Sequence, residues 1–279
     1  MKEKLTAFIF ITRPVNFLIT ILSVIVAAII SSSQNYFELT VFLSAIAAGV
    51  TASAGNVIND IFDFEIDKIN QPQRPLPAKK ISVKQAYILY YTFLLISLLI
   101  SFFISLPVLL VVLFSHFILF LYSKILKKIP LVGNATVAFL TGFVFIFGGI
   151  VVGSPTAAVV PALFAFLINL IRELVKDIQD VNGDRAVGLF TFPIKFGVQK
   201  SKILITIFTL TLILFTFYPF ITKLYKIEYF VIVMALVNPI LIYCAKKMYE
   251  KELEKNLKKI SNLLKLSMVF GLLAIYLGV

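Results

Sequence analysis

The sequence offers little side-chain chemistry beyond carboxylates, amides and amines. Its 279 residues include a single cysteine, Cys244, which excludes an intramolecular disulfide and a thiolate metal cluster. The only histidine, His116, lies in the apolar run VLLVVLFSHFILFLY, where we expect it to pack between helices or to face a lumen. Histidine-based metal sites and Ser/His/Asp triads are therefore excluded.

Charged residues are also scarce, at 14%, whereas 60% of the residues are hydrophobic and the mean hydropathy is +0.99. Such a chain cannot form a water-soluble surface, so the sequence predicts an integral membrane protein. No stretch is polar enough for a separate soluble domain, and we expect one membrane domain over residues 1–279. The apolar segment after Pro14 has the length of a span and lacks an Ala-x-Ala-like site before Ser31, so we expect it to be retained.

Apolar segments recur along the whole chain and predict an all-α, polytopic fold with nine transmembrane helices. Short runs rich in Ser, Asn, Gly and Pro separate them. The predicted helices cover residues 14–33, 38–62, 83–105, 106–123, 132–152, 156–175, 201–220, 228–245 and 261–278.

A net charge of +12 can indicate a nucleic-acid binder, but in a membrane protein the informative property is the side of the membrane on which the basic residues fall, and we expect no nucleic-acid partner. Every Lys and Arg except Lys223 and Lys226 lies in the N-terminal segment or in a connection on one side of the predicted helices. This asymmetry predicts a cell-membrane protein with its N-terminus and active-site loops in the cytoplasm and its C-terminus outside. The cluster from Lys246 to Lys265 is predicted to contact anionic membrane lipid.

The acidic residues are also distributed unevenly along the chain. Eight of the 14 lie in two short windows, NDIFDFEID at 59–67 and RELVKDIQDVNGD at 172–184. Carboxylates at a membrane border are costly unless they are used. Both windows contain the pattern D-I-x-D-x-x-x-D, and each is followed by a proline-containing connection. We interpret the repeat as the duplication of one four-helix unit, which gives two related units.

Helical spacing predicts that each window presents its carboxylates on one face. The first face comprises Asn56, Asp60, Asp63 and Asp67, with Asn59 beside it. The second face comprises Glu173, Asp177, Asp180 and Asp184. We expect the two faces to line one cavity, whereas Glu65 points away from it and is predicted to lie on the surface.

Two facing rows of carboxylates require a hard cation, because without one they would repel each other. Magnesium binds oxygen ligands, usually a few carboxylates together with phosphate oxygens and water. The predicted Mg²⁺ ligands are Asn59, Asp60, Asp63, Asp67, Asp177, Asp180 and Asp184. Side chains near the motifs that could bind a diphosphate are Arg74, Tyr122, Lys124, Lys127, Lys128, Lys176 and Arg185. Solvated helix caps would explain one such motif more easily than two matched ones.

At these residues the chain resembles the UbiA superfamily of intramembrane prenyltransferases. The family pattern, N-D-x-x-D-x-x-x-D followed by K-D-x-x-D-x-x-G-D, appears here as NDIFDFEID and KDIQDVNGD. The match extends over most of residues 13–200 and includes Arg13-Pro14-x-Asn16, the RPLP loop, Tyr122-Ser123 and Gly133-Asn134.

The resemblance implies nine helices around a central cavity that opens laterally to lipid, and metal-dependent loss of pyrophosphate from an allylic donor. It also implies that Arg13 binds the diphosphate and that Asn16, Asn56 and Asn134 contact substrate. The predicted catalytic residues are Asp63, Asp67, Asp177 and Asp180, which would hold magnesium on the donor while its carbon–oxygen bond ionises. The acceptor hydroxyl would then attack C1 in a water-poor cavity.

Within the family, NVINDIFDFEIDKINQPQRPLP and INLIRELVKDIQDVNGD most resemble the archaeal digeranylgeranylglyceryl phosphate synthases. These enzymes join a geranylgeranyl group to geranylgeranylglyceryl phosphate, a lipid-like acceptor, in membrane phospholipid biosynthesis. Prenylation of an aromatic acceptor such as 4-hydroxybenzoate or homogentisate is the alternative. An ion-coupled transporter is the alternative of another class. A CDP-alcohol phosphotransferase is disfavoured because its D-G-x-x-A-R run is missing.

Overall fold

The structure, a computed structural model, describes residues 2–32 and 38–279, and these residues form helices and turns without a strand. The breaker residues Ser33, Gln34 and Asn35 lie outside the described residues. The helices are α1 (Lys2–Ile11), α2 (Pro14–Ser31), α3 (Leu39–Phe62), α4 (Phe64–Asn70), α5 (Val83–Ile104), α6 (Leu106–Lys124), η1 (Leu126–Lys128), α7 (Val132–Val151), η2 (Pro155–Ala158), α8 (Val159–Gln179), α9 (Val181–Ala186), α10 (Phe192–Phe196), α11 (Val198–Phe215), α12 (Tyr218–Ile221), α13 (Ile227–Ile232), η3 (Val233–Val237), α14 (Asn238–Lys247) and α15 (Leu253–Gly278).

Nine stretches of the described residues are helical, long and apolar enough to cross a bilayer, which confirms the predicted fold class. The sixth stretch combines η2 with α8, the seventh combines α11 with α12, and the eighth runs from α13 through η3 to α14. They cover Pro14–Ser31, Leu39–Phe62, Val83–Ile104, Leu106–Lys124, Val132–Val151, Pro155–Gln179, Val198–Ile221, Ile227–Lys247 and Leu253–Gly278.

The last of these helices, α15, begins at Leu253, whereas the sequence predicts a start at residue 261. The prediction followed hydropathy, and the first turns of α15 are rich in lysine. Their helical form is stabilised by packing, because Leu257, Ile260 and Leu264 are buried at helical spacing. Lysine side chains on the other face remain compatible with this packing.

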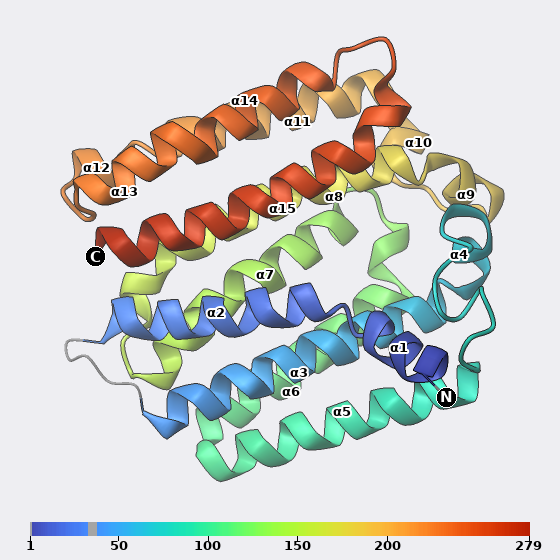
Figure 1. The fold of residues 1–279 in the computed structure, drawn as a ribbon, viewed down its shortest axis with the longest axis horizontal. Coiled ribbons are helices and arrows are strands. Elements are labelled where there is room, and N and C mark those ends of the chain that lie inside the picture. Colours follow the sequence, from blue (N-terminus) through green and yellow to red (C-terminus); the bar gives the residue numbers. More distant parts are fainter. Residues whose placement is uncertain (1, 33–37) are drawn as a thin grey trace. The chain divides into compact units, whose positions relative to one another are not determined.

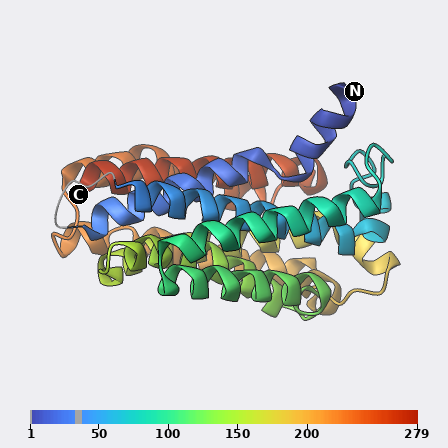
Figure 2. The same ribbon diagram turned by 90° about the horizontal axis from the view of Figure 1, so that it is seen from below.

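Helix α1 is a second difference, because the sequence predicts no helix before Pro14. An isolated helix of this length is marginal in water. Ala7 and Ile11 lie one turn apart and are both buried, so contacts with the rest of the chain stabilise α1. In Figure 2, α1, the dark blue helix beside the N-terminus, is inclined to the helix α2 that follows it.

The chain forms two compact units. Unit 1 comprises Met1–Lys128, Val144–Ala158 and Asn182–Gly188. In it, α2, α5 and α6 pack against α3 (Figure 1). The α3 span is 67% buried while the α5 span is 17% buried, so α3 is the central helix of this unit. Its run of Ala, Gly and Ser residues permits the close approach of neighbouring helices that membrane packing requires.

Unit 2 comprises Ile129–Phe143, Val159–Val181 and Leu189–Val279. Here α8 packs against α11 and α15, and α15 also contacts α13 and α14. Buried polar side chains join the helices: the Tyr229 hydroxyl donates to the Thr216 carbonyl oxygen at 3.0 Å, and Asn238 Nδ2 donates to Thr216 Oγ1 at 3.1 Å. These bonds satisfy polar groups that would be costly in a bilayer.

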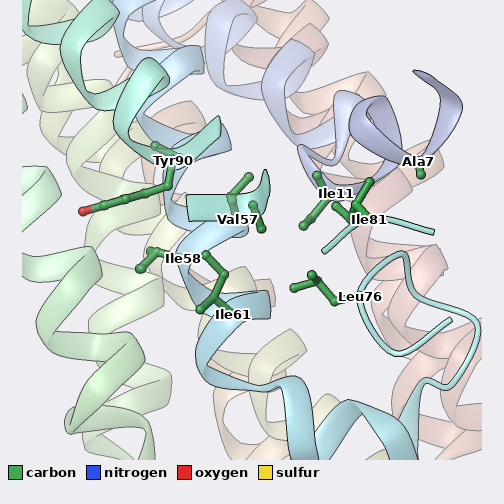
Figure 3. Close-up of a cluster of buried hydrophobic side chains, with 10 residues drawn as sticks. Ala7, Ile11, Val57, Ile58, Ile61, Leu76, Ile81 and Tyr90 are labelled. Carbon is green, nitrogen blue, oxygen red and sulfur yellow. The ribbon is translucent and has the colours of Figure 1, made fainter. Parts of the chain in front are cut away.

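A hydrophobic cluster in unit 1 packs α1, the connection between α4 and α5, and the first part of α5 around the C-terminal end of α3 (Figure 3). Ile11 belongs to α1, Val57 to α3, and Leu76 and Ile81 to the connection between α4 and α5. A capping box at the start of α5 fixes the far end of that connection, where Ser82 Oγ accepts the Gln85 N–H at 3.2 Å. The RPLP loop is therefore attached by its own side chains.

Shortening Leu76 to alanine should loosen this connection, because Leu76 is 3% exposed within the cluster. We expect Leu76→Ala to lower the free energy of unfolding by about 2 to 4 kcal/mol. Thermal unfolding in detergent and the rate of proteolysis at residues 71–82 measure the effect. Ile69→Ala is the control, since Ile69 in α4 is 51% exposed, and equal losses in both variants would contradict the assigned role of the cluster.

Candidate active site

Both acidic motifs contain a break in the helix at their second aspartate. Helix α3 ends at Phe62 and α4 begins at Phe64, with Asp63 between them at φ −89° and ψ 4°. Helix α8 ends at Gln179 and α9 begins at Val181, with Asp180 in the turn. The prediction of one continuous helical face for each motif is therefore wrong beyond these aspartates. The common break supports the predicted duplication.

The carboxylates of the first motif are held by basic side chains from distant parts of unit 1. Arg13 Nη2 lies 2.6 Å from Asp60 Oδ1, and Arg74 Nη1 lies 3.4 Å from the same oxygen. Arg74 Nη1 also donates to Asp67 Oδ2 at 2.7 Å. Asp60 and Asp67 are buried, so each needs such a partner.

Burial shifts the pKa of Asp67 despite its ion pair. Burial, together with the nearby charge of Asp60, raises the pKa of Asp67 to about 6, although Arg74 acts in the opposite direction. Burial alone would lower the pKa of Arg74, but the charges of Asp60 and Asp67 outweigh it and raise that pKa above its usual value. With a pKa of about 6 the Asp67 carboxyl group is still mainly ionised at neutral pH, as its ion pair with Arg74 requires.

Arg13 joins α1 to α2 in an unusual backbone conformation. Its φ of 55° and ψ of 71° lie in the left-handed region, which costs a residue other than glycine about 1 kcal/mol. The preceding Thr12 carbonyl oxygen accepts a hydrogen bond from Asn56 Nδ2 at 3.1 Å. The α1–α2 junction is therefore fixed to α3 both through Asn56 and through the Arg13–Asp60 ion pair.

Asp63 uses both of its oxygens. Lys127 Nζ lies 2.5 Å from Asp63 Oδ1, and Asn59 Nδ2 donates to Asp63 Oδ2 at 2.7 Å. Lys127 comes from η1, directly after α6, and its ammonium lies 6.0 Å from the centre of the Phe62 ring. One lysine and one amide thus orient the side chain at the break between α3 and α4.

Other predicted diphosphate ligands lie in unit 1 near the same end of α6. Tyr122 is half-buried on α6, whereas Lys124 and Lys128 are exposed. The Lys124 ammonium lies 5.9 Å from the centre of the Phe120 ring. Asn16 is half-buried in the first turn of α2, one turn beyond Arg13.

The donor chemistry of the first motif fits magnesium. Its side chains offer only oxygen donors, as a hard cation prefers. Asn59 Oδ1 is buried and, among the described residues, has no hydrogen-bond partner. An orphaned buried oxygen of this kind is a candidate cation ligand. The described residues contain no group of three His, Cys, Asp or Glu side chains already gathered around one point, so the carboxylates are held here by cations of the protein itself.

The second motif is divided between the units. In unit 2, Asn134 Nδ2 donates to Asp177 Oδ2 at 2.9 Å, so this predicted substrate contact lies beside the second motif. Glu173 is buried there and pairs with Lys176 at 2.9 Å. Lys176, a predicted diphosphate ligand, therefore contacts a carboxylate in this structure. Asp180 is half-buried.

The end of the second motif lies in unit 1, where Asp184 is buried. The neighbouring Gly183 N–H donates to Asn70 Oδ1 at 3.0 Å. Arg185 is exposed, as is Glu65, which confirms the prediction that Glu65 lies on the surface. Sequence reasoning missed Asn70 and Thr12, since neither belongs to either acidic motif. The one available signal for the Asn70 contact was the glycine in K-D-x-x-D-x-x-G-D, because glycine permits a close backbone approach.

Known proteins resemble this chain over nearly its whole length. The model of the UbiA prenyltransferase family matches residues 18–269. Digeranylgeranylglyceryl phosphate synthase of Methanosphaera stadtmanae is 33% identical over 273 residues, which are 97% of this chain and 98% of that protein. A solved structure described as digeranylgeranylglyceryl phosphate synthase in membranes has a TM-score of 0.75 at 33% identity, and covers 99% of this chain and 98% of its own. A UbiA homologue from Archaeoglobus fulgidus, bound to DMAPP and Mg²⁺, shares the fold with a TM-score of 0.65 at 18% identity, over 96% of this chain and 98% of its own.

Removing Arg74 should leave Asp60 with one cation fewer and Asp67 without its ion pair. We expect Arg74→Ala to lower the free energy of unfolding by about 3 kcal/mol, because it leaves the buried Asp67 carboxylate without a partner for its charge. Adding Asp67→Asn should restore part of that loss, since a neutral amide needs no cation. Thermal unfolding in detergent measures both variants.

The matched control is Lys68→Ala, which removes an exposed contact between Lys68 and Glu65 in α4. We expect this variant to unfold close to the temperature of the unmodified protein. If Arg74→Ala and Lys68→Ala had the same effect, the Arg74 ion pairs would not stabilise unit 1.

Proposed function

The chain belongs to the UbiA prenyltransferase family, and on this basis we propose that it transfers a geranylgeranyl group from geranylgeranyl diphosphate to geranylgeranylglyceryl phosphate. The free hydroxyl oxygen of the acceptor bonds to C1 of the donor. The bond between C1 and the diphosphate oxygen breaks, the hydroxyl proton is released, and pyrophosphate leaves. The relatives named as digeranylgeranylglyceryl phosphate synthases support this choice of acceptor.

The observation that carries the proposal is the balanced group of charges at the C-terminal end of α3. Asp60, Asp63 and Asp67 pair there with Arg13, Lys127 and Arg74. Because these charges already balance one for one, an arriving diphosphate brings negative charge that the group cannot neutralise by itself. Magnesium is the ion that the oxygen donors fit, and when bound it would neutralise the leaving diphosphate.

The side chains of the chain itself divide into three roles in this proposal. Metal ligands are Asn59, Asp60, Asp63, Asp67, Asp177, Asp180 and Asp184, of which Asp63, Asp67, Asp177 and Asp180 are the catalytic carboxylates. Groups that bind the diphosphate are Arg13, Arg74, Tyr122, Lys124, Lys127, Lys128 and Lys176. Groups that contact other parts of the substrates are Asn16, Asn56 and Asn134. The magnesium-bound Archaeoglobus homologue supports the metal through the shared fold.

The topology completes the proposal. The chain is a multi-pass membrane protein, and we place it in the cell membrane with the N-terminus and the connections that carry both motifs in the cytoplasm. The C-terminus then lies outside. Residues 1–279 act as one prenyltransferase domain, and membrane lipid surrounds its helices.

Mass analysis of products tests the reaction directly. Membranes that contain the protein are incubated with geranylgeranyl diphosphate, Mg²⁺ and either geranylgeranylglyceryl phosphate or an aromatic acid. We expect the diether product with the glyceryl phosphate acceptor, pyrophosphate release, and loss of both with EDTA. Prenylated 4-hydroxybenzoate or homogentisate in place of the diether would refute the acceptor. Ion uptake by vesicles without pyrophosphate release would favour a transporter.

Asp63→Ala should abolish transfer while the protein still inserts and purifies, because Asp63 is proposed to hold the metal and is placed there by Asn59 and Lys127. We expect the same result for Asp180→Ala. Transfer rates in membranes at equal protein amounts measure both. Glu65→Ala is the control, since Glu65 is an exposed carboxylate two residues from Asp63. Full activity in both aspartate variants would contradict the metal role.

A further inference from the structure

One hydrogen bond within unit 1 connects α4 with α9, the two short helices that follow the breaks in the acidic motifs. Asn70 Oδ1 accepts from the Gly183 backbone N–H at 3.0 Å, across 113 residues of sequence. Asn70 is the last residue of α4, three residues after Asp67. Gly183 lies in α9, immediately before Asp184. The bond therefore joins the segments that carry the last aspartate of each motif.

The contact is close enough to require glycine at position 183. A Cβ atom built there would lie 2.2 Å from Asn70 Oδ1 and 2.3 Å from Asn70 Cγ, so the two side chains could not both remain in place. Gly183 is buried, and its backbone conformation is helical. The requirement is therefore for space next to Asn70, since no positive φ is involved.

The first motif provides an internal comparison. The two copies break at the same aspartate, and Ile66 occupies the position in the first copy that Gly183 occupies in the second. Ile66 is half-buried, so a large side chain is compatible with this kind of break. The glycine of the second copy is thus explained by the approach of Asn70 and not by the local fold of the motif.

Both aspartates beside this contact are buried. Asp67 is 4% exposed on α4, and Asp184 is 7% exposed on α9. Asp67 and Asn70 are three residues apart on one helix and so lie on neighbouring positions of its surface. A change in the Asn70 to Gly183 distance would move α9 relative to α4, and with it the carboxylate of Asp184 relative to that of Asp67.

We propose that Asn70 is a positioning residue for the metal site: by accepting the Gly183 N–H, it holds Asp184 in register with Asp67 so that these two carboxylates bind the same magnesium diphosphate. This role rests on the proposed function and deepens it. Asn70 contacts no reacting atom in this proposal. Its effect reaches the metal only through the backbone at Gly183.

A set of variants at the two positions tests the proposal. Asn70→Ala removes the acceptor, Gly183→Ala introduces the overlap, and the double variant has the new methyl group but no longer the side chain that it meets. Asn70→Asp keeps an oxygen acceptor for the Gly183 N–H and should restore most of what Asn70→Ala loses. Asn182→Ala is the matched control, because Asn182 is an exposed asparagine next to Gly183.

The first readout is the Mg²⁺ concentration for half-maximal transfer, measured beside the KM of the acceptor. For Asn70→Ala we expect the Mg²⁺ requirement to rise about three- to tenfold, the effect of one lost hydrogen bond, with the acceptor KM unchanged. Gly183→Ala should raise it further, and the double variant should return to the level of Asn70→Ala. Asn182→Ala should match the unmodified protein.

The second readout needs no turnover. Thermal unfolding in detergent is followed with and without Mg²⁺ and inorganic pyrophosphate, and we expect the metal-dependent rise in midpoint to shrink in Asn70→Ala. A lower midpoint with an unchanged Mg²⁺ requirement and unchanged metal-dependent rise would show a merely structural contact and overturn the proposal. So would equal effects of Gly183→Ala and the double variant. If the unmodified protein forms no prenylated product, the proposed function fails, while the metal-dependent rise still tests Asn70.

Discussion

Buried negative charge at the C-terminal end of α3 is the constraint on which the rest of unit 1 depends. A carboxylate such as that of Asp60 cannot remain ionised in a nonpolar environment without cations and hydrogen bonds. The required cations come from two chain segments outside α3: Arg13 from the junction of α1 and α2, and Arg74 from the RPLP loop. The hydrophobic cluster around Leu76 holds the loop in place, so apolar packing and ion pairing support the same arrangement.

The duplicated motif explains how such a site can serve a reaction with a highly charged leaving group. Each copy ends one long apolar helix and turns the chain at its second aspartate. The last aspartate of each copy therefore lies on the short helix that follows. Charge in the first copy is balanced by the protein's own cations, which keeps the site stable before substrate arrives. Binding of a metal with a diphosphate would then exchange partners among groups that are already paired, without burying a new unpaired charge.

Sequence alone predicted the parts of this structure that depend on composition and short-range pattern. Hydropathy located the nine spans found among the described residues, and the D-I-x-D-x-x-x-D repeat drew attention to the two groups of carboxylates. The two missed helical segments share a cause, since each depends on contacts between distant residues. Helix α1 exists because Ala7 and Ile11 are buried against other segments, and the early start of α15 depends on Leu257 and Ile260. The pairing of Arg13 with Asp60 is separated by 47 residues and leaves no periodic signal.

Two unrelated demands meet at Arg13, and this has a consequence for mutational tolerance. The left-handed backbone favours glycine or asparagine, whereas Asp60 is reached by a long guanidinium side chain. Glycine satisfies the first demand and lysine part of the second, but only arginine among the basic residues offers a planar fork to the carboxylate. Such a position has almost no neutral replacements, so over evolutionary time it should drift far more slowly than exposed lysines outside the site, such as Lys68.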